Sequence, residues 1–277
     1  MRVILGIDAL AGCADGLAGR VQWGVPFTLS HVVAVVPLRR WLPSAGLVVG
    51  AVVPDLAYYL PLPYSSGVAH DWRVGWLVDV PAGLVVLAVF HLVLRAPLTA
   101  LAPCGVRARL PDRGVGGRGP ATVAVLAAAL AAGMATHLAW DAFTHVDGVV
   151  VTHWPVMRLP VLGVHRVFNV VMYVSSLAGL AVLVVWFARW YRRVPPRPGR
   201  FSGVGRRSRR LVVAGGGSAA GVGAAVLGTG DGAAASLYDQ VRAMLLGATA
   251  GFTAVLVAYA AMWHIGRLWT ARWRVRH

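Results

Sequence analysis

Long apolar runs alternate with short, arginine-rich polar stretches along this chain of 277 residues. Several runs approach the ~20 residues with which an α-helix crosses the hydrocarbon of a bilayer. Charged residues make up 13% of the chain, about half the share usual in a soluble domain. The pattern predicts an all-α, polytopic membrane bundle of about six transmembrane helices, with a soluble all-helical protein as the weaker alternative. The predicted spans are Ser44–Leu62, Val74–Leu94, Ala121–Phe143, Val167–Ala188, Leu211–Gly230 and Val241–Ile265.

Before these spans, Phe27–Leu38 forms a shorter apolar run, about 18 Å long if helical and too short to cross ~30 Å of hydrocarbon. It is predicted to be a re-entrant or interfacial helix. The first span is interrupted by Pro54-Asp55. Two arrangements therefore stay open: Phe27–Leu62 forms a re-entrant helical hairpin, or the first span is tilted and broken at Pro54. A broken helix at membrane depth is tolerated where it lines a polar cavity.

Residues 1–24 interleave four charges with short apolar pieces, which suit neither a signal peptide nor a spanning helix. We expect this atypical extension to be poorly packed against the spans and translation to start at Val25. The alternative is an amphipathic segment lying on the cytoplasmic leaflet.

The net charge of +16 first suggests nucleic acid as a partner. However, every basic residue is Arg and every acidic residue is Asp, which indicates coding bias, and the arginines fall mostly between the apolar runs. Nucleic acid is therefore excluded, and membrane lipids are the expected partners. The oligomeric state is left undetermined.

The arginines also orient the spans, because cytoplasmic loops of membrane proteins carry an excess of Arg and Lys. The loop 96–120, a basic linker over 190–210 and a basic tail over 267–277 are rich in Arg, whereas the alternate loops 63–73, 144–166 and 230–240 hold little. This predicts a multi-pass protein of the plasma membrane with both termini in the cytoplasm. A membrane domain over 25–189 is followed by two further transmembrane helices over 211–266.

The stretch Thr136–His145 is the strongest candidate for chemistry. It places His137, Asp141 and His145 at spacings of four, on one face of a helix. Such groups are costly in a membrane helix and normally face a bundle interior or a wet cavity. Imidazole nitrogen and carboxylate oxygen also bind zinc and similar divalent ions. With only Cys13 and Cys104 in the chain, a metal would have to use His and Asp.

Other polar residues near the predicted outer face add to this set. Asp55 follows Pro54 inside an apolar run, and His70 and Asp71 precede the second span. His31 stands at the start of the short apolar run. Asp79, six residues into the second span, is expected to cap or pair locally rather than to bind metal.

These residues lie in an ordered set of motifs that resembles the bacterial membrane family called domain of unknown function 4184, over roughly Pro26 to Arg189. The motifs are Pro26–His31, Gly50–Asp55, His70 followed by Val78–Pro81, Thr136–His145 followed by Asp147-Gly148, and Ser175-Ser176. More distantly, their order resembles membrane-bound metal-dependent hydrolases and the helical zinc-dependent phospholipase C group. That resemblance implies a helical bundle holding a divalent metal, zinc being the expected one, with ligands His31, Asp55, His70, His137 and Asp141. The context Ala69-His70-Asp71 departs from the Thr-His-Ser pattern of the family.

Two functions follow as hypotheses. The first is a membrane-embedded metal-dependent hydrolase acting on a phosphoester or lipid-like substrate, with His145 or Asp71 as general base. The second is a non-catalytic membrane protein, namely a metal or proton carrier or a scaffold. Convergence of Asp55, His70, His137 and Asp141 on one point would favour the hydrolase, and a line of such groups along the membrane normal would favour a carrier.

Overall fold

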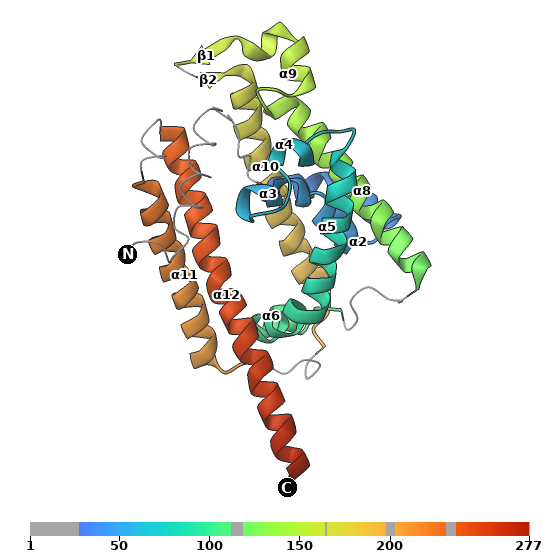
Figure 1. The fold of residues 1–277 in the computed structure, drawn as a ribbon, viewed down its shortest axis with the longest axis vertical. Coiled ribbons are helices and arrows are strands. Elements are labelled where there is room, and N and C mark those ends of the chain that lie inside the picture. The colour runs from blue at the N-terminus through green and yellow to red at the C-terminus, as the bar shows by residue number, and fades with distance from the viewer. Residues whose placement is uncertain (1–27, 112–118, 164, 198–202, 231–236, 277) are drawn as a thin grey trace, which may run out of the picture. The chain divides into compact units, whose positions relative to one another are not determined.

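The computed structural model describes residues 28–111, 119–163, 165–197, 203–230 and 237–276 (Figure 1). The predicted extension over 1–24 lies outside the described residues. Apart from one short hairpin, the secondary structure in the described part of the chain is helical, which confirms the predicted all-helical membrane bundle. Five helical segments there are long and apolar enough to cross a membrane, against about six predicted. They are Gly75–Leu101, Pro120–His153, Val167–Arg193, Arg206–Gly228 and Asp239–Trp269.

The predicted first span, Ser44–Leu62, is not one long helix. It divides into α2 (Ser44–Gly50), the 3-10 turn η2 (Val53–Asp55) and α3 (Leu56–Tyr59). Pro54 has no N–H to donate to a helical carbonyl and its ring obstructs the preceding turn, so the α-helix cannot continue through it. The predicted first span is therefore a short, divided apolar segment rather than one continuous helix.

A helical hairpin precedes the break. The 3-10 helix η1 (Thr28–Arg40) contacts α2, and Val35, Leu47 and Ala51 form a buried cluster with Ala129. Residues 28–59 thus contain both a helical hairpin and a break at Pro54, and their path relative to the membrane stays a prediction.

The described residues divide into two compact units, which are taken separately here. The larger holds the residues up to Trp140 and those from Ser175 onward, and the smaller holds Asp141–Val174.

In the larger unit, one long helix packs closely against the hairpin. The helix α8 (Pro120–Thr144) contributes its first 21 residues. A Cβ atom added to Gly133 of α8 would overlap the backbone of Leu47 and Ala51, and one added to Gly50 of α2 would overlap the backbone of Leu130. Two glycines therefore let the backbones of α2 and α8 meet almost directly.

The short helix α4 (Ser66–Ala69) begins at Ser65, whose hydroxyl accepts a hydrogen bond from the N–H of Val68. A long apolar segment follows, made of α5 (Gly75–Val89), the π-turn η3 (Phe90–Leu94) and α6 (Arg95–Leu101). Along α5 the buried positions recur every four residues, which defines one inward face. They are Gly75, Asp79, Gly83 and Leu87.

The last two helices, α11 (Arg206–Gly228) and α12 (Leu237–Arg276), lie side by side as an antiparallel pair (Figure 1). A Cβ atom on Gly223 would overlap the backbone of Gly247, and one on Gly251 would overlap that of Ala219. Small residues thus make the contact, as is common between transmembrane helices. The side chain of Tyr259 ties α12 to α6 by donating a hydrogen bond to the carbonyl of Pro97, at 3.0 Å. Helix α12 continues to Arg276, so the predicted basic tail is helical almost to its end.

Arginine-rich segments meet one another at one end of this unit. Arg109, which follows α7 (Cys104–Arg107), donates to the carbonyl of Tyr191 near the end of α10 (Val167–Arg193), at 2.7 Å. Arg209 at the start of α11 donates to the carbonyl of Leu101, at 2.9 Å. The segments predicted to share the cytoplasmic side are therefore neighbours, and the orientation itself stays a prediction.

The smaller unit has its own core. The helix α9 (Val149–His153), the 3-10 turn η4 (Pro155–Arg158) and the first residues of α10 bury Val151, Met157 and Phe168 against one another. Between η4 and α10 runs the antiparallel hairpin of β1 (Pro160–Leu162) and β2 (His165–Arg166). Gly163 turns this hairpin with a φ of 56°, in the left-handed region that favours glycine.

Candidate metal centre

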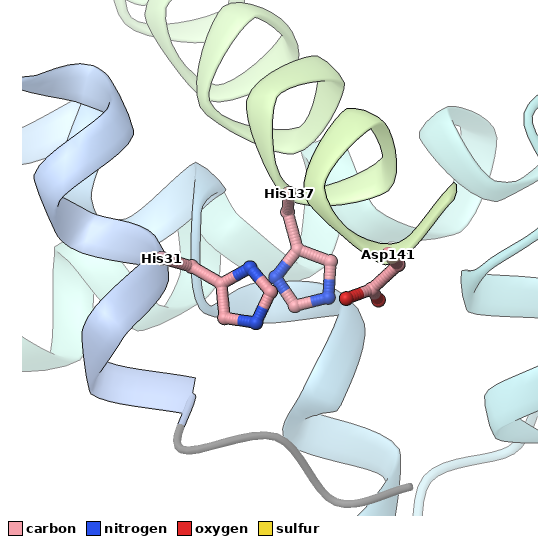
Figure 2. Close-up of side chains that lie close together, drawn as sticks. All are labelled: His31, His137 and Asp141. Atoms are coloured by element: carbon pink, nitrogen blue, oxygen red, sulfur yellow. The ribbon is translucent and has the colours of Figure 1, made fainter. Parts of the chain in front are cut away.

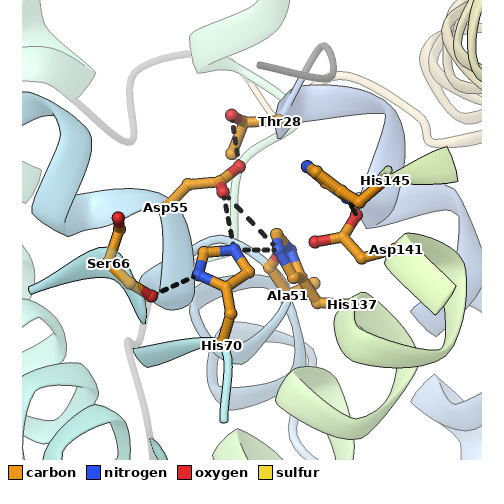
Figure 3. A network of polar contacts seen from close by, with 8 residues as sticks. All are labelled: Thr28, Ala51, Asp55, Ser66, His70, His137, Asp141 and His145. Atoms are coloured by element: carbon orange, nitrogen blue, oxygen red, sulfur yellow. Dashed lines mark hydrogen bonds and ion pairs between the residues drawn. The ribbon is translucent and has the colours of Figure 1, made fainter. Parts of the chain in front are cut away.

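Three of the predicted ligands converge inside the larger unit, each from a different element. Asp55 ends η2, His70 follows α4 and His137 lies on α8 (Figure 3). Nε2 of His70 lies 3.3 Å from Oδ1 of Asp55, and Nε2 of His137 lies 3.5 Å from the same oxygen. The two Nε2 atoms are 3.3 Å apart. Asp55 and His137 are fully buried, whereas the side chain of His70 is 18% exposed.

Backbone carbonyls orient both imidazole rings. Nδ1 of His70 donates to the carbonyl of Ser66 at 2.8 Å, and Nδ1 of His137 donates to that of Ala51 at 2.9 Å. Because a carbonyl can only accept, each Nδ1 carries a proton, and in a neutral ring Nε2 then offers a lone pair. Two such lone pairs therefore face each other and Oδ1 of Asp55. Histidines that bind metals are typically held in this way through the other ring nitrogen.

The carboxylate of Asp55 is fixed from its other side. The hydroxyl of Thr28 donates a hydrogen bond of 2.6 Å to Oδ2, which leaves Oδ1 turned toward the histidines. Burial raises the pKa of Asp55, but the interaction with His70, the electrostatic interaction with His137 and the hydrogen bond from Thr28 outweigh burial, so that the pKa lies below its usual 3.8. Asp55 lies outside the five long apolar segments and is ionised at neutral pH.

The spacing of the three atoms matches what a small divalent ion requires. Zinc bonds to nitrogen and oxygen are about 2.1 Å long, and at tetrahedral angles they separate neighbouring ligand atoms by about 3.4 Å. The three observed separations are 3.3, 3.3 and 3.5 Å. Three electron-rich atoms this close in a buried site would repel one another unless a proton or a cation lay among them. Asp55, His70 and His137 therefore fit a metal site.

His31 lies beside this cluster. Its ring stacks on that of His137 with 4.2 Å between centroids and 22° between planes (Figure 2). The two rings offer nitrogen atoms within 4.8 Å of each other, and His31 is fully buried. The structure thus places His31 next to the three-residue cluster, and its role as a ligand stays a prediction.

Asp141 and His145 belong to the smaller unit. Asp141 lies one turn beyond His137 on α8 (Figure 2), and Nδ1 of His145 lies 3.1 Å from Oδ1 of Asp141. The carboxylate therefore orients the imidazole, an arrangement that general bases often use. The predicted roles of Asp141 as ligand and of His145 as base are not decided by this contact.

Asp71, the other predicted base, has a structural task. Oδ1 accepts hydrogen bonds from the N–H groups of Arg73 and Val74, at 2.7 and 3.4 Å, in the exposed turn that precedes α5. Its carboxylate thus stabilises this turn. A catalytic role for Asp71 stays a prediction.

Sequence reasoning missed Asp79. We expected it to cap or pair locally, yet it is fully buried and neither oxygen has a hydrogen-bond partner in the described structure. The ionisable groups that interact with it are His70, His137 and Asp55, the members of the cluster. The spacing Gly75–Asp79–Gly83 was a usable signal, because two glycines four residues to either side mark the closely packed face of a helix.

Fold and site together define an all-helical membrane protein with a buried cluster of histidine and aspartate side chains. The family model of domain of unknown function DUF4184 matches residues 25–261, and the chain belongs to this family. The match extends beyond the predicted limit at Arg189 and covers α11 and much of α12. No curated protein and no solved structure matches the chain. The likeness to hydrolases therefore rests on the order of the motifs alone.

Proposed function

We propose that this protein binds a divalent metal ion, zinc being the expected one, through Asp55, His70 and His137, and uses it to hydrolyse a phosphoester or lipid-like substrate at the membrane. One observation carries the proposal: three lone-pair atoms, none of them an obvious proton donor to the others, lie at 3.3–3.5 Å from one another.

The number of ligands supports catalysis over a purely structural site. Structural zinc sites are usually closed by four protein ligands, whereas catalytic sites have three and keep one position for water or substrate. A metal in such a site lowers the pKa of its bound water to ~7 and polarises the bond to be cleaved. His70 is the one partly exposed member of the cluster, and we propose that substrate enters on its side.

The pair formed by Asp141 and His145 supports a role for His145 as general base. A carboxylate that contacts Nδ1 orients the imidazole, and an imidazole held in this way is a common form of general base. Asp141 and His145 follow His137 by four and eight residues in the sequence, and Asp141 contacts His145. Asp71 is the weaker candidate, since Oδ1 of its carboxylate already accepts backbone hydrogen bonds.

Elemental analysis of protein purified in detergent without added metal tests the metal. We expect a divalent ion in the wild type and its loss in Asp55→Asn and His137→Ala. His153→Ala is the matched control. His153 is an exposed histidine whose Nδ1 contacts the carbonyl of Val149 and the hydroxyl of Thr152, both in its own helix α9. A wild type without metal, or ligand variants that retain it, would contradict the metal site.

Hydrolysis is tested separately. Vesicles of mixed phospholipids and a chromogenic phosphodiester are incubated with wild type, with His137→Ala and with chelator-treated protein. Turnover that disappears in the last two samples and returns on adding metal supports the hydrolase. Metal binding with no turnover on either substrate would leave a non-catalytic metal carrier or scaffold.

A further inference from the structure

Asp79 lies on the face of α5 that packs against α8, close to the turn that carries His137. A Cβ atom on Gly75 would overlap the side-chain end of Met134, and one on Gly83 would overlap the side chain of Leu130. Asp79 stands midway between these glycines on the same buried face. Its side chain therefore projects toward α8 between Leu130 and Met134, and Met134 is three residues before His137.

The buried carboxyl group has a specific set of neighbours. Both oxygens lack a hydrogen bond in the described structure, and the side chain is fully buried. The ionisable groups that feel its charge are His70, His137, Asp55 and Tyr64. Tyr64 lies in the loop before α4, where burial and the charge of Asp79 raise its pKa. A carboxyl group without partners in an apolar interior costs several kcal/mol unless something else compensates it.

A count of charges identifies what compensates it. The imidazoles of His70 and His137 carry no charge when their Nε2 atoms are lone-pair donors. Among the carboxylates of the larger unit, Asp55 contributes one negative charge and Asp79 a second, so these two together balance an ion of charge +2. Within that unit, Asp55 alone would leave one positive charge uncompensated in a buried site, which is unfavourable.

We infer that Asp79 is a fourth member of the metal centre and its second acidic one, supplying the second negative charge that a divalent ion requires there. This inference rests on the proposed metal site and adds a residue to it. Asp79 then has no structural partner in the metal-free protein, and its carboxylate is stabilised chiefly by the bound ion.

The experiment is a zinc titration of the full-length protein in detergent against a chromogenic chelator, for wild type, Asp79→Asn and Asp79→Glu. Asp239→Asn, in the first turn of α12, is the control for loss of one negative charge. We expect Asp79→Asn to bind zinc at least tenfold more weakly than wild type, Asp79→Glu to recover part of the loss, and Asp239→Asn to bind as wild type does.

Thermal unfolding in excess chelator gives the second measurement. We expect metal-free Asp79→Asn to melt at the same temperature as metal-free wild type or higher, because the substitution removes a buried negative charge near Asp55. Zinc affinity of Asp79→Asn within twofold of wild type would overturn the inference, as would a metal-free Asp79→Asn that no longer folds. A wild type that binds no zinc would instead contradict the proposed metal site itself, so the two failures are distinguishable.

Discussion

Nδ1 of His137 donates a hydrogen bond of 2.9 Å to the carbonyl of Ala51, a residue 86 positions earlier in the chain. This carbonyl is available because the helix ends there. In the 3-10 turn before Pro54 the N–H of Asp55 bonds to Val52, three residues back, instead of to Ala51. The break at Pro54 thus both releases the acceptor that orients His137 and brings Asp55 to the site.

Thr28 should control metal affinity through Asp55. Its hydroxyl holds Oδ2, and loss of such an outer hydrogen bond typically weakens metal binding 10–100-fold. We therefore expect Thr28→Ala to lower zinc affinity by about that factor, whereas Thr28→Ser, which keeps the hydroxyl, should stay close to wild type. Competition with a chelating dye measures both. Equal affinities for the alanine and serine variants would show that this hydrogen bond does not matter.

Gly133 should be a packing position that tolerates no side chain. A Cβ atom there would overlap the backbone of Leu47 and Ala51, which cannot move aside as a flexible side chain can. We expect Gly133→Ala to destabilise the protein by about 1–3 kcal/mol, measured by thermal unfolding in detergent. Gly221→Ala is the control, since a Cβ atom on Gly221 of α11 meets nothing within 4 Å. It should be neutral or stabilising by up to ~1 kcal/mol; an equal loss in both variants would argue against close α2–α8 packing.

His145 should affect turnover and not metal content. If it acts as general base, His145→Ala should lower turnover on the phosphodiester about 10²–10⁴-fold while elemental analysis still finds the metal. The contact with Asp141 predicts a smaller loss for Asp141→Asn, provided that Asp141 is not itself a ligand. Loss of metal in His145→Ala would instead make His145 part of the metal site.

The orientation of the spans predicts opposite locations for two segments. The segment 190–210 contains eight arginines, whereas 144–166 contains two, so the first should be cytoplasmic and the second external. Reporter insertions within 190–210 and at Gly163 of the β hairpin would measure this in cells. Because the Arg-rich segments meet at one end of the larger unit, the reverse result would move all of them together to the outside.

Much of the fold was predictable because the relevant signals are local. Long apolar runs located the five spanning segments, since the hydrocarbon length sets how many apolar residues are needed. The candidate ligands were visible for a related reason: histidine and aspartate are rare in such runs and costly there, so Asp55, His137 and Asp141 stood out individually.

Tertiary structure decided which of those groups meet. Asp55, His70 and His137 come together because Gly50 and Gly133 let α2 and α8 approach at backbone distance, and periodicity along one helix carries no information on its neighbour. The same contact turns the carbonyl of Ala51 toward His137, and packing of α5 on α8 buries Asp79, which the sequence alone suggested was a local cap. Hydrophobic pattern reports whether a side chain is inside; only packing between elements far apart in the chain determines what it faces there.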